Sequence, residues 1–203
     1  MVRPPRFDRD RLLDAAVRLA ASTGPTGVTM SAVAGDVGAP SGSVYHRFSG
    51  RTALLAEVWL RTVERFQEGC SEVLEAPTDP LRAVCAAARH VVAWSRAHPQ
   101  EASLLLYRAE DFGQANWSEE HIRRAHRGNK RVRATLSVLA AGLGADGPRA
   151  AERVELAVIV LPLSVVRLHV WAGHPVPAHA EDLAEECAAA LLGVPSPSTP
   201  ATG

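Results

Sequence analysis

A run of side chains suited to contact with a polyanion lies in the first quarter of the sequence. Small polar residues come first and are followed by aromatic, titratable and cationic ones: Ser41, Gly42, Ser43, Tyr45, His46, Arg47 and Arg51. A serine hydroxyl can donate to or accept from the edge of a nucleic-acid base, and short side chains let a helix backbone approach the bases closely. Tyrosine and arginine can reach phosphate oxygens, which provide affinity and register but no sequence choice. These residue types indicate DNA as the partner.

Two short helices joined by a tight turn would present these side chains. Thr29 is a good N-cap for the first helix, and Val28 can pack on Val33 as a hydrophobic staple. Gly38 falls where the chain must leave that helix, because glycine takes the left-handed conformation without a steric penalty. Pro40 suits the start of the second helix, where its missing N–H would have had no partner. The pattern predicts a helix-turn-helix.

The second helix needs an apolar side that holds it on a core. Val44 and Phe48 lie at positions i and i+4, so they share one helical face and we expect both to be buried. An ordinary helical hairpin with a solvated polar face is the alternative. The succession of residues 45–48, followed by Arg51 and an apolar helix, favours a second helix that enters the major groove.

The segment 29–54 resembles, closely and in order, the DNA-binding signature of the TetR family of bacterial repressors. The resemblance covers about residues 7–60. It implies that Ser41, Gly42 and Ser43 lie nearest the bases in the major groove. It implies further contacts to the duplex, chiefly to phosphates, from the other exposed residues: Thr29, Ser31, Tyr45, His46, Arg47 and Arg51.

Three positions depart from the family pattern. Ala32 stands where an acidic residue commonly completes the capping box, and residues 39–41 read Ala-Pro-Ser where Val-Ser-Lys is common. Arg51 replaces the usual lysine. None of these departures disturbs the predicted fold, but because of them the resemblance does not give the operator sequence.

The charge of the chain is divided between a basic beginning and an acidic remainder. The 203 residues together carry no net charge, but residues 1–51 hold seven Arg and four Asp, a net charge of +3, and the rest carries −3. This division fits a separate DNA-binding domain.

The cysteines and the apolar runs indicate a cytoplasmic protein. Cys70, Cys85 and Cys187 lie in apolar helical patterns and are expected to be free thiols in a reducing compartment. The N-terminus has no apolar segment typical of a secretory signal. The apolar run 156–166 is too short to span a bilayer, so we expect no membrane partner.

Helical periodicity continues along the chain, without strand-like alternation. The sequence predicts an all-α protein of about nine helices, of which the later ones lie at 52–75, 80–98, 100–111, 119–143, 148–173 and 179–192. We divide the chain into a helix-turn-helix DNA-binding domain (1–51), a helical effector-binding and dimerisation domain (52–193) and a disordered tail (194–203). The helices at 148–173 and 179–192 are expected to pair with those of a second copy, and Pro162 should kink the first of them.

The family resemblance also implies a small-molecule effector that changes the spacing of the two DNA-binding domains of a dimer. Aromatic and polar residues of the middle helices suit an organic ligand: His90, Trp94, Tyr107, Arg108, Phe112, Trp117 and His121. Each of them, taken singly, also fits an ordinary core or surface position. The basic stretch 123–133 is either a second nucleic-acid surface or a solvated helix face, and we favour the solvated face.

No catalytic or metal-binding pattern stands out. His169, His174 and His179 recur every five residues, which puts them on different helical faces, and no carboxylate or cysteine completes a ligand set. We expect no enzyme activity, no metal and no cofactor. The sequence predicts a dimeric transcriptional regulator, a repressor that a small-molecule effector releases from a palindromic DNA operator. The alternative is a helical ligand-binding or interaction module without operator binding.

Overall fold

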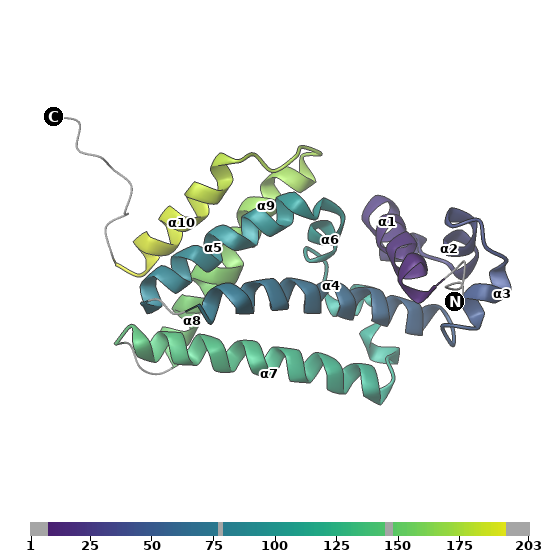
Figure 1. Ribbon diagram of the computed structural model, residues 1–203, viewed down its shortest axis with the longest axis horizontal. Coiled ribbons are helices and arrows are strands. Elements are labelled where there is room, and N and C mark those ends of the chain that lie inside the picture. Colours follow the sequence, from purple (N-terminus) through teal and green to yellow (C-terminus); the bar gives the residue numbers. More distant parts are fainter. Residues whose placement is uncertain (1–7, 77–78, 145–147, 194–203) are drawn as a thin grey trace, which may run out of the picture. The chain divides into compact units, whose positions relative to one another are not determined.

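The computed structural model describes residues 8–76, 79–144 and 148–193, and within these ranges every regular element is helical (Figure 1). This confirms the predicted all-α class. Counted with the continuous run Pro148–Trp171 as one helix, the described residues form nine α-helices, as the sequence predicts. The tail 194–203, for which the sequence predicts disorder, lies outside the described residues.

Along the chain the α-helices are α1 (Arg9–Gly27), α2 (Met30–Asp36), α3 (Ser41–Tyr45), α4 (Arg51–Leu74), α5 (Pro80–Ala97), α6 (Pro99–Leu104), α7 (Glu119–Gly142), α8 (Pro148–Glu155), α9 (Leu161–Trp171) and α10 (His179–Leu191). Two 3-10 turns, η1 (Ala109–Phe112) and η2 (Gln114–Asn116), precede α7. A π-helical turn, η3 (Leu156–Val160), joins α8 to α9.

Side chains cap the beginnings of three long helices. Asp8 accepts from the backbone N–H of Arg11 at 2.8 Å at the start of α1, and Asp79 accepts from that of Arg82 at 3.0 Å at the start of α5. The hydroxyl of Ser118 does the same at the start of α7 at 3.3 Å. Each cap satisfies a backbone donor that has no partner inside the helix.

The helix predicted at 100–111 ends early, at Leu104. The backbone N–H of Arg108 donates to the carboxylate of Asp111 at 2.7 Å, and this local bond opens the 3-10 turn η1 where an α-helix would otherwise continue. Phe112 at the end of η1 is fully buried. Packing of this ring therefore holds the irregular segment in place.

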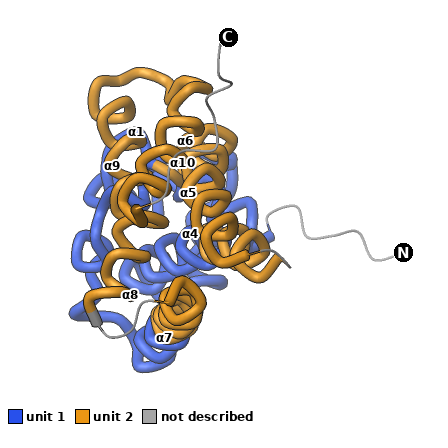
Figure 2. The backbone as a smooth tube through the Cα atoms, turned by 90° about the vertical axis from the view of Figure 1, so that its left-hand side faces the viewer, with its two compact units in different colours: residues 1–65, 103–127 blue, residues 66–102, 128–203 orange. Residues whose placement is uncertain are grey.

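The chain forms two compact units, which are coloured separately in Figure 2. Unit 1 comprises residues 1–65 and 103–127, so it contains the predicted DNA-binding domain together with the first parts of α4 and α7. Its core includes Leu12, Val28, Val33, Val44, Leu54, Leu104 and Phe112. Unit 2 comprises residues 66–102 and 128–203. Its core includes Val84, Ala88, Leu136, Val154, Val158 and Ala188.

The run 148–171 of unit 2 departs from the regular α-helix shortly before Pro162, the residue for which the sequence predicts a kink. Proline has no N–H and cannot continue the regular helical ladder. The turn η3 lies directly before it, and there the backbone N–H of Leu161 bonds to the carbonyl of Leu156 in the wider π-helical register. By length and composition residues 149–171 form one helix that could cross a membrane, but part of its surface is buried in the core of unit 2.

Candidate nucleic-acid interface

The predicted helix-turn-helix is present as α2, a glycine turn and α3. Thr29 caps α2, since its hydroxyl accepts from the backbone N–H of Ala32 at 3.1 Å. After α2 the backbone N–H of Ala39 donates to the carbonyl of Ala34 at 2.8 Å, and Gly38 in this turn has a φ of 66°. That is the left-handed conformation that favours glycine. The cap and the turn predicted from the sequence are both confirmed.

The five-residue helix α3 is fixed by one face on the core of unit 1. Val44 is fully buried, and Phe48, just beyond the helix, is 3% exposed. The outer face is exposed and carries Ser41, Gly42, Tyr45 and His46. Ser43 and Arg47 are half-buried, and Arg47 Nη1 donates to the carbonyl of Ser43 at 3.2 Å. Of the residues expected to contact DNA, Ser41, Gly42, Ser43 and Tyr45 lie on this short helix, and His46 and Arg47 follow it directly.

The protein leaves the space beside Gly42 empty. A Cβ atom at this position would meet nothing within 4 Å outside its own helix, and the φ of Gly42 is not positive. Neither packing nor backbone strain therefore requires glycine, although glycine inside a helix costs about 1 kcal/mol relative to alanine. A glycine at this position leaves room for an external partner to approach the backbone closely.

Arg51, the first residue of α4, binds the end of α1. Its Nε donates to the carbonyl of Val28 at 2.6 Å, and its Nη2 donates to the carbonyls of Pro25 at 2.8 Å and Thr26 at 3.2 Å. A cation is favoured where helix carbonyls lack intrahelical partners. The phosphate contact of Arg51 stays a prediction, and the structure adds a role that the sequence did not reveal. Arg51 joins α4 to the segment that leads from α1 into α2.

The residues predicted to bind an effector fall into two groups, one in each unit. In unit 2, the ring of Trp94 stacks on His98 with centroids 4.6 Å apart and meets Phe66 of α4 edge-on at 5.3 Å. His90 lies one turn before Trp94 on α5, and its Nε2 atom is buried with no hydrogen-bond partner among the described residues. Burial lowers the pKa of His90, so this ring is neutral at pH 7.

In unit 1, three of the predicted residues take part in aromatic packing before α7. Phe112 lies against Trp59 of α4 at 5.1 Å and meets Tyr107 edge-on at 6.2 Å. The indole N–H of Trp117 donates to the carbonyl of Phe112 at 3.0 Å. The two remaining predicted residues of this group make polar contacts instead, namely Arg108 and His121.

Three rings that complete these groups were not predicted as site residues: Trp59, Phe66 and His98. Trp59 and Phe66 lie seven residues apart on α4 and therefore share one helical face, which is the signal that the sequence held. His98 follows Trp94 by four residues, a spacing at which side chains meet along a helix.

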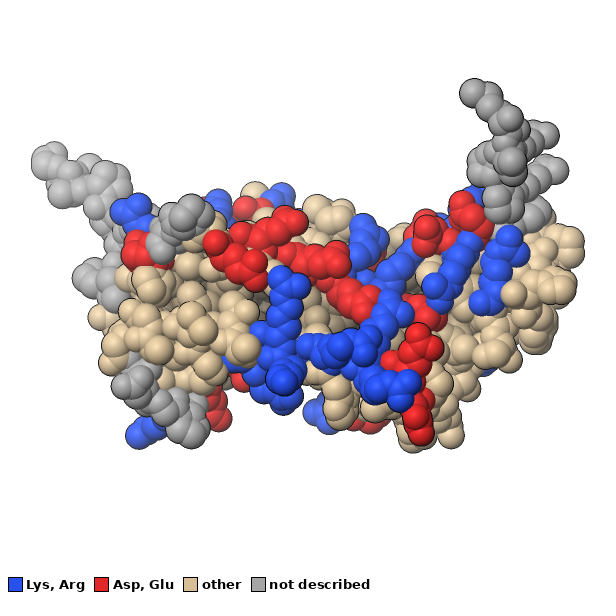
Figure 3. All heavy atoms as spheres, turned by 60° about the horizontal axis from the view of Figure 1, so that its bottom comes forward, with Lys and Arg blue, Asp and Glu red and all other residues tan. Residues whose placement is uncertain are grey.

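The basic stretch 123–133 of α7 is partly neutralised by glutamates. Arg123 pairs with Glu119 one turn earlier at 3.0 Å, and Arg131 pairs with Glu75, the residue directly after α4, at 3.2 Å. Figure 3 shows that Lys and Arg side chains over α7 lie among Asp and Glu side chains. This mixture of signs favours a solvated helix face over a second nucleic-acid surface.

An all-helical chain with a helix-turn-helix near its beginning has the architecture of a bacterial DNA-binding regulator. Residues 12–58, which include α2, the turn and α3, match the family described as "Bacterial regulatory proteins, tetR family". Over these residues, and therefore in its helix-turn-helix, the chain is similar to the DNA-binding regulators of that family. No curated protein matches it in sequence.

Solved structures share the fold over nearly the whole chain. A transcriptional regulator from Rhodococcus sp. RHA1 is 25% identical, with a TM-score of 0.67 over 92% of this chain and 95% of that one. FadR from Bacillus subtilis, solved in complex with stearoyl-CoA, is 14% identical, with a TM-score of 0.68 over 89% and 98% of the two chains. PfmR from Thermus thermophilus is 20% identical, with a TM-score of 0.66 over 93% and 97%.

Replacement of Gly42 by alanine is expected to weaken DNA binding without loss of stability. The added methyl group meets nothing in the protein, and alanine is the better helix former, so Tm should stay the same or rise. Operator affinity should fall about tenfold, which corresponds to about 1.4 kcal/mol. Gly35→Ala in α2 is the matched control, because Gly35 is equally exposed and open. Equal operator affinities for the two variants would contradict a close approach at Gly42.

Arg51→Ala is expected to reduce both stability and DNA affinity. Loss of the bonds to three carbonyls should lower the free energy of unfolding by about 1–2 kcal/mol, measured by chemical denaturation. Binding to operator and to unrelated DNA should weaken by the same factor, because phosphate contacts carry no sequence choice. Arg47→Ala is the comparison, since it loses a single backbone bond and should cost less stability. A changed sequence preference with intact affinity would show that Arg51 has another role.

Proposed function

We propose that the protein is a dimeric cytoplasmic repressor that binds a palindromic operator. The observation that carries this proposal is the placement of α3, whose Val44 side is fixed in the core while its outer face, with Ser41 and Tyr45, is open. A helix held in this way can enter a major groove without rearrangement. Two copies related by a two-fold axis would read two half-sites separated by one or more helical turns of DNA.

An apolar surface on α9 and α10 supports dimerisation through these helices. Leu168 and Trp171 on α9 are 72% and 73% exposed, and Leu183 on α10 is 44% exposed. Leu156 and Val160 are also exposed and precede Leu168 at helical spacing. Large apolar side chains that gather on the surface of a regulator mark an interface. A second copy that presents the same helices would cover them.

We infer that the effector is a largely apolar organic molecule bound in unit 2. The rings of Phe66, Trp94 and His98 provide apolar contact, and the unpartnered Nε2 of His90 is a polar atom that such a ligand would satisfy. FadR from Bacillus subtilis was solved in complex with stearoyl-CoA. By analogy we propose that this chain also responds to a bound ligand, without assigning it the same one. The effector releases the operator by binding more tightly to a conformation with lower DNA affinity.

Selection of bound sequences from a random double-stranded DNA library tests the proposed function. The purified protein should enrich one inverted repeat. Its affinity for that repeat should fall steeply as salt is raised, because neutralised phosphates release counterions. A folded, dimeric protein that enriches no sequence would contradict operator binding and favour a helical ligand-binding module.

The proposed interface predicts that Leu168→Glu produces a monomer. Burying the glutamate charge in an apolar contact costs more free energy than the contact provides. The dimer should therefore dissociate at micromolar concentration, as measured by sedimentation velocity. Val138→Glu on α7 is the matched control, because Val138 is also 72% exposed. It should leave the dimer intact. If Val138→Glu dissociated the dimer and Leu168→Glu did not, the interface would lie elsewhere.

A further inference from the structure

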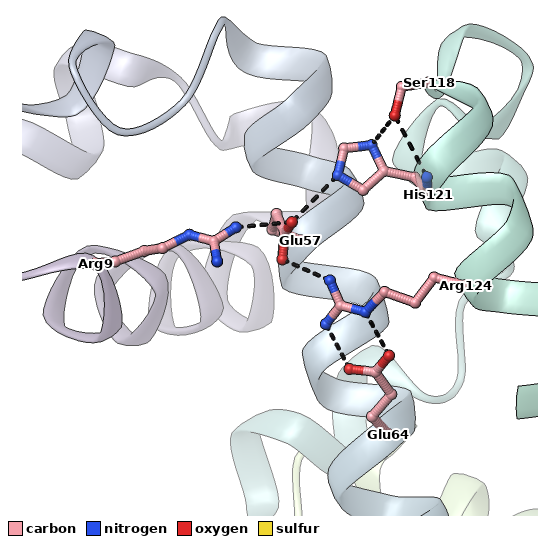
Figure 4. Close-up of polar contacts among 6 residues, drawn as sticks. All are labelled: Arg9, Glu57, Glu64, Ser118, His121 and Arg124. Atoms are coloured by element: carbon pink, nitrogen blue, oxygen red, sulfur yellow. Dashed lines mark hydrogen bonds and ion pairs between the residues drawn. The ribbon is translucent and has the colours of Figure 1, made fainter.

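Glu57 of α4 is a buried carboxylate that three other side chains share. It is 9% exposed and lies in unit 1. Its Oε1 is 2.7 Å from Arg9 Nη2 of α1 and 3.2 Å from His121 Nε2 of α7. Its Oε2 is 2.9 Å from Arg124 Nη1, also of α7. Figure 4 shows these side chains converging on Glu57 from opposite sides.

The partners on α7 are held in turn by their own contacts. Arg124 donates through Nε and Nη2 to the two carboxylate oxygens of Glu64. Glu64 lies on α4, seven residues after Glu57. The Nδ1 of His121 lies 2.9 Å from the hydroxyl of Ser118, which also caps α7. Because a carboxylate only accepts, His121 Nε2 must carry the hydrogen toward Glu57, and in the neutral ring Nδ1 accepts from Ser118. The ring orientation is thereby fixed.

The partner on α1 connects Glu57 to the DNA-reading helix. The guanidinium of Arg9 lies over the ring of Phe48, with its central carbon 5.5 Å from the ring centroid, in cation–π geometry. Phe48 is one of the two apolar anchors of α3. A continuous set of contacts within unit 1 therefore runs from the first turns of α7, through Glu57 and Arg9, to the anchor of α3.

The negative charge of Glu57 makes its contacts with Arg9, His121 and Arg124 depend on one another. Burial raises the pKa of the Glu57 carboxyl, but Arg124, Arg9 and His121 more than offset this effect and bring the pKa below its ordinary value. The group is therefore ionised at pH 7. When a buried carboxylate loses one partner, its negative charge must be stabilised by closer contacts with the partners that remain. Arg9 and His121 share a single oxygen, so a change at one alters the other without direct contact.

We propose that Glu57 is a positioning residue through which the place of the first turns of α7 controls the seating of α3. When α7 moves and His121 and Arg124 no longer contact Glu57, Arg9 remains as the partner that balances the negative charge of Glu57. Arg9 then moves toward Glu57 and away from the Phe48 ring. The anchor of α3 then loses one of its covering contacts and the helix is held less firmly for DNA. This inference rests on the proposed function, because operator affinity is its readout.

A double-mutant cycle on operator affinity tests the coupling. Arg9→Gln and Arg124→Gln should each weaken operator binding by about 3–10-fold, and the double variant should be weaker than either single one by less than about threefold. Glu57→Asp, which keeps the charge, should retain more affinity than Glu57→Gln. Thermal unfolding by circular dichroism checks that each variant is folded. If Arg124→Gln does not fold, His121→Asn takes its place with the same expected non-additivity.

The ion pair of Arg61 with Asp14 provides the matched control. It also joins α4 to α1, at 2.7 Å, but within the described part of the chain neither residue forms an ion pair with α7. Arg61→Gln combined with Arg124→Gln should give additive effects on operator affinity. Additive effects of Arg9→Gln and Arg124→Gln would overturn the inference, as would equal coupling in the Arg61 cycle. Absence of operator binding by the unmodified protein would instead contradict the proposed function itself.

Discussion

The burial of Val44 and Phe48 is the contact on which the DNA-reading face depends. A helix of five residues has too few internal hydrogen bonds to be stable alone. Full burial of each of these side chains contributes about 1.5–3 kcal/mol, and together they offset a large part of the cost of ordering so short a segment. Thr29 and Gly38 define where the segment begins and turns, but the core of unit 1 gives it a fixed orientation. The outer face is then free to be polar.

Several arginines of unit 1 hold its helices together. Arg9 pairs with the buried Glu57, Arg18 pairs with Asp36 between α1 and α2, and Arg51 binds carbonyls at the end of α1. The planar guanidinium suits all three sites because it donates in several fixed directions. The excess of positive charge in residues 1–51 therefore overstates the charge that is free to meet phosphates. Part of that excess holds the helices together.

The helices and the turn could be predicted from local signals in the sequence. Contacts between residues far apart in the sequence could not be predicted. The cap at Thr29, the turn at Gly38 and the i, i+4 pair of α3 each act within a few residues, so they could be read directly. The early end of α6 was missed because a side-chain cap further along the chain competes with the helix. Glu57 was missed because its partners lie on α1 and α7, although a carboxylate within the buried stripe of α4 was a visible irregularity.

The division of α3 into a buried and an open face affects how such a protein can evolve. Residues of the open face, such as Ser41 and Gly42, have few packing contacts with the rest of unit 1. Substitutions there can change which DNA sequence is preferred while the stability of the fold is conserved. A duplicated copy of the gene could thus acquire a new operator through a few mutations. The same scaffold would serve unrelated sets of genes without redesign of its interior.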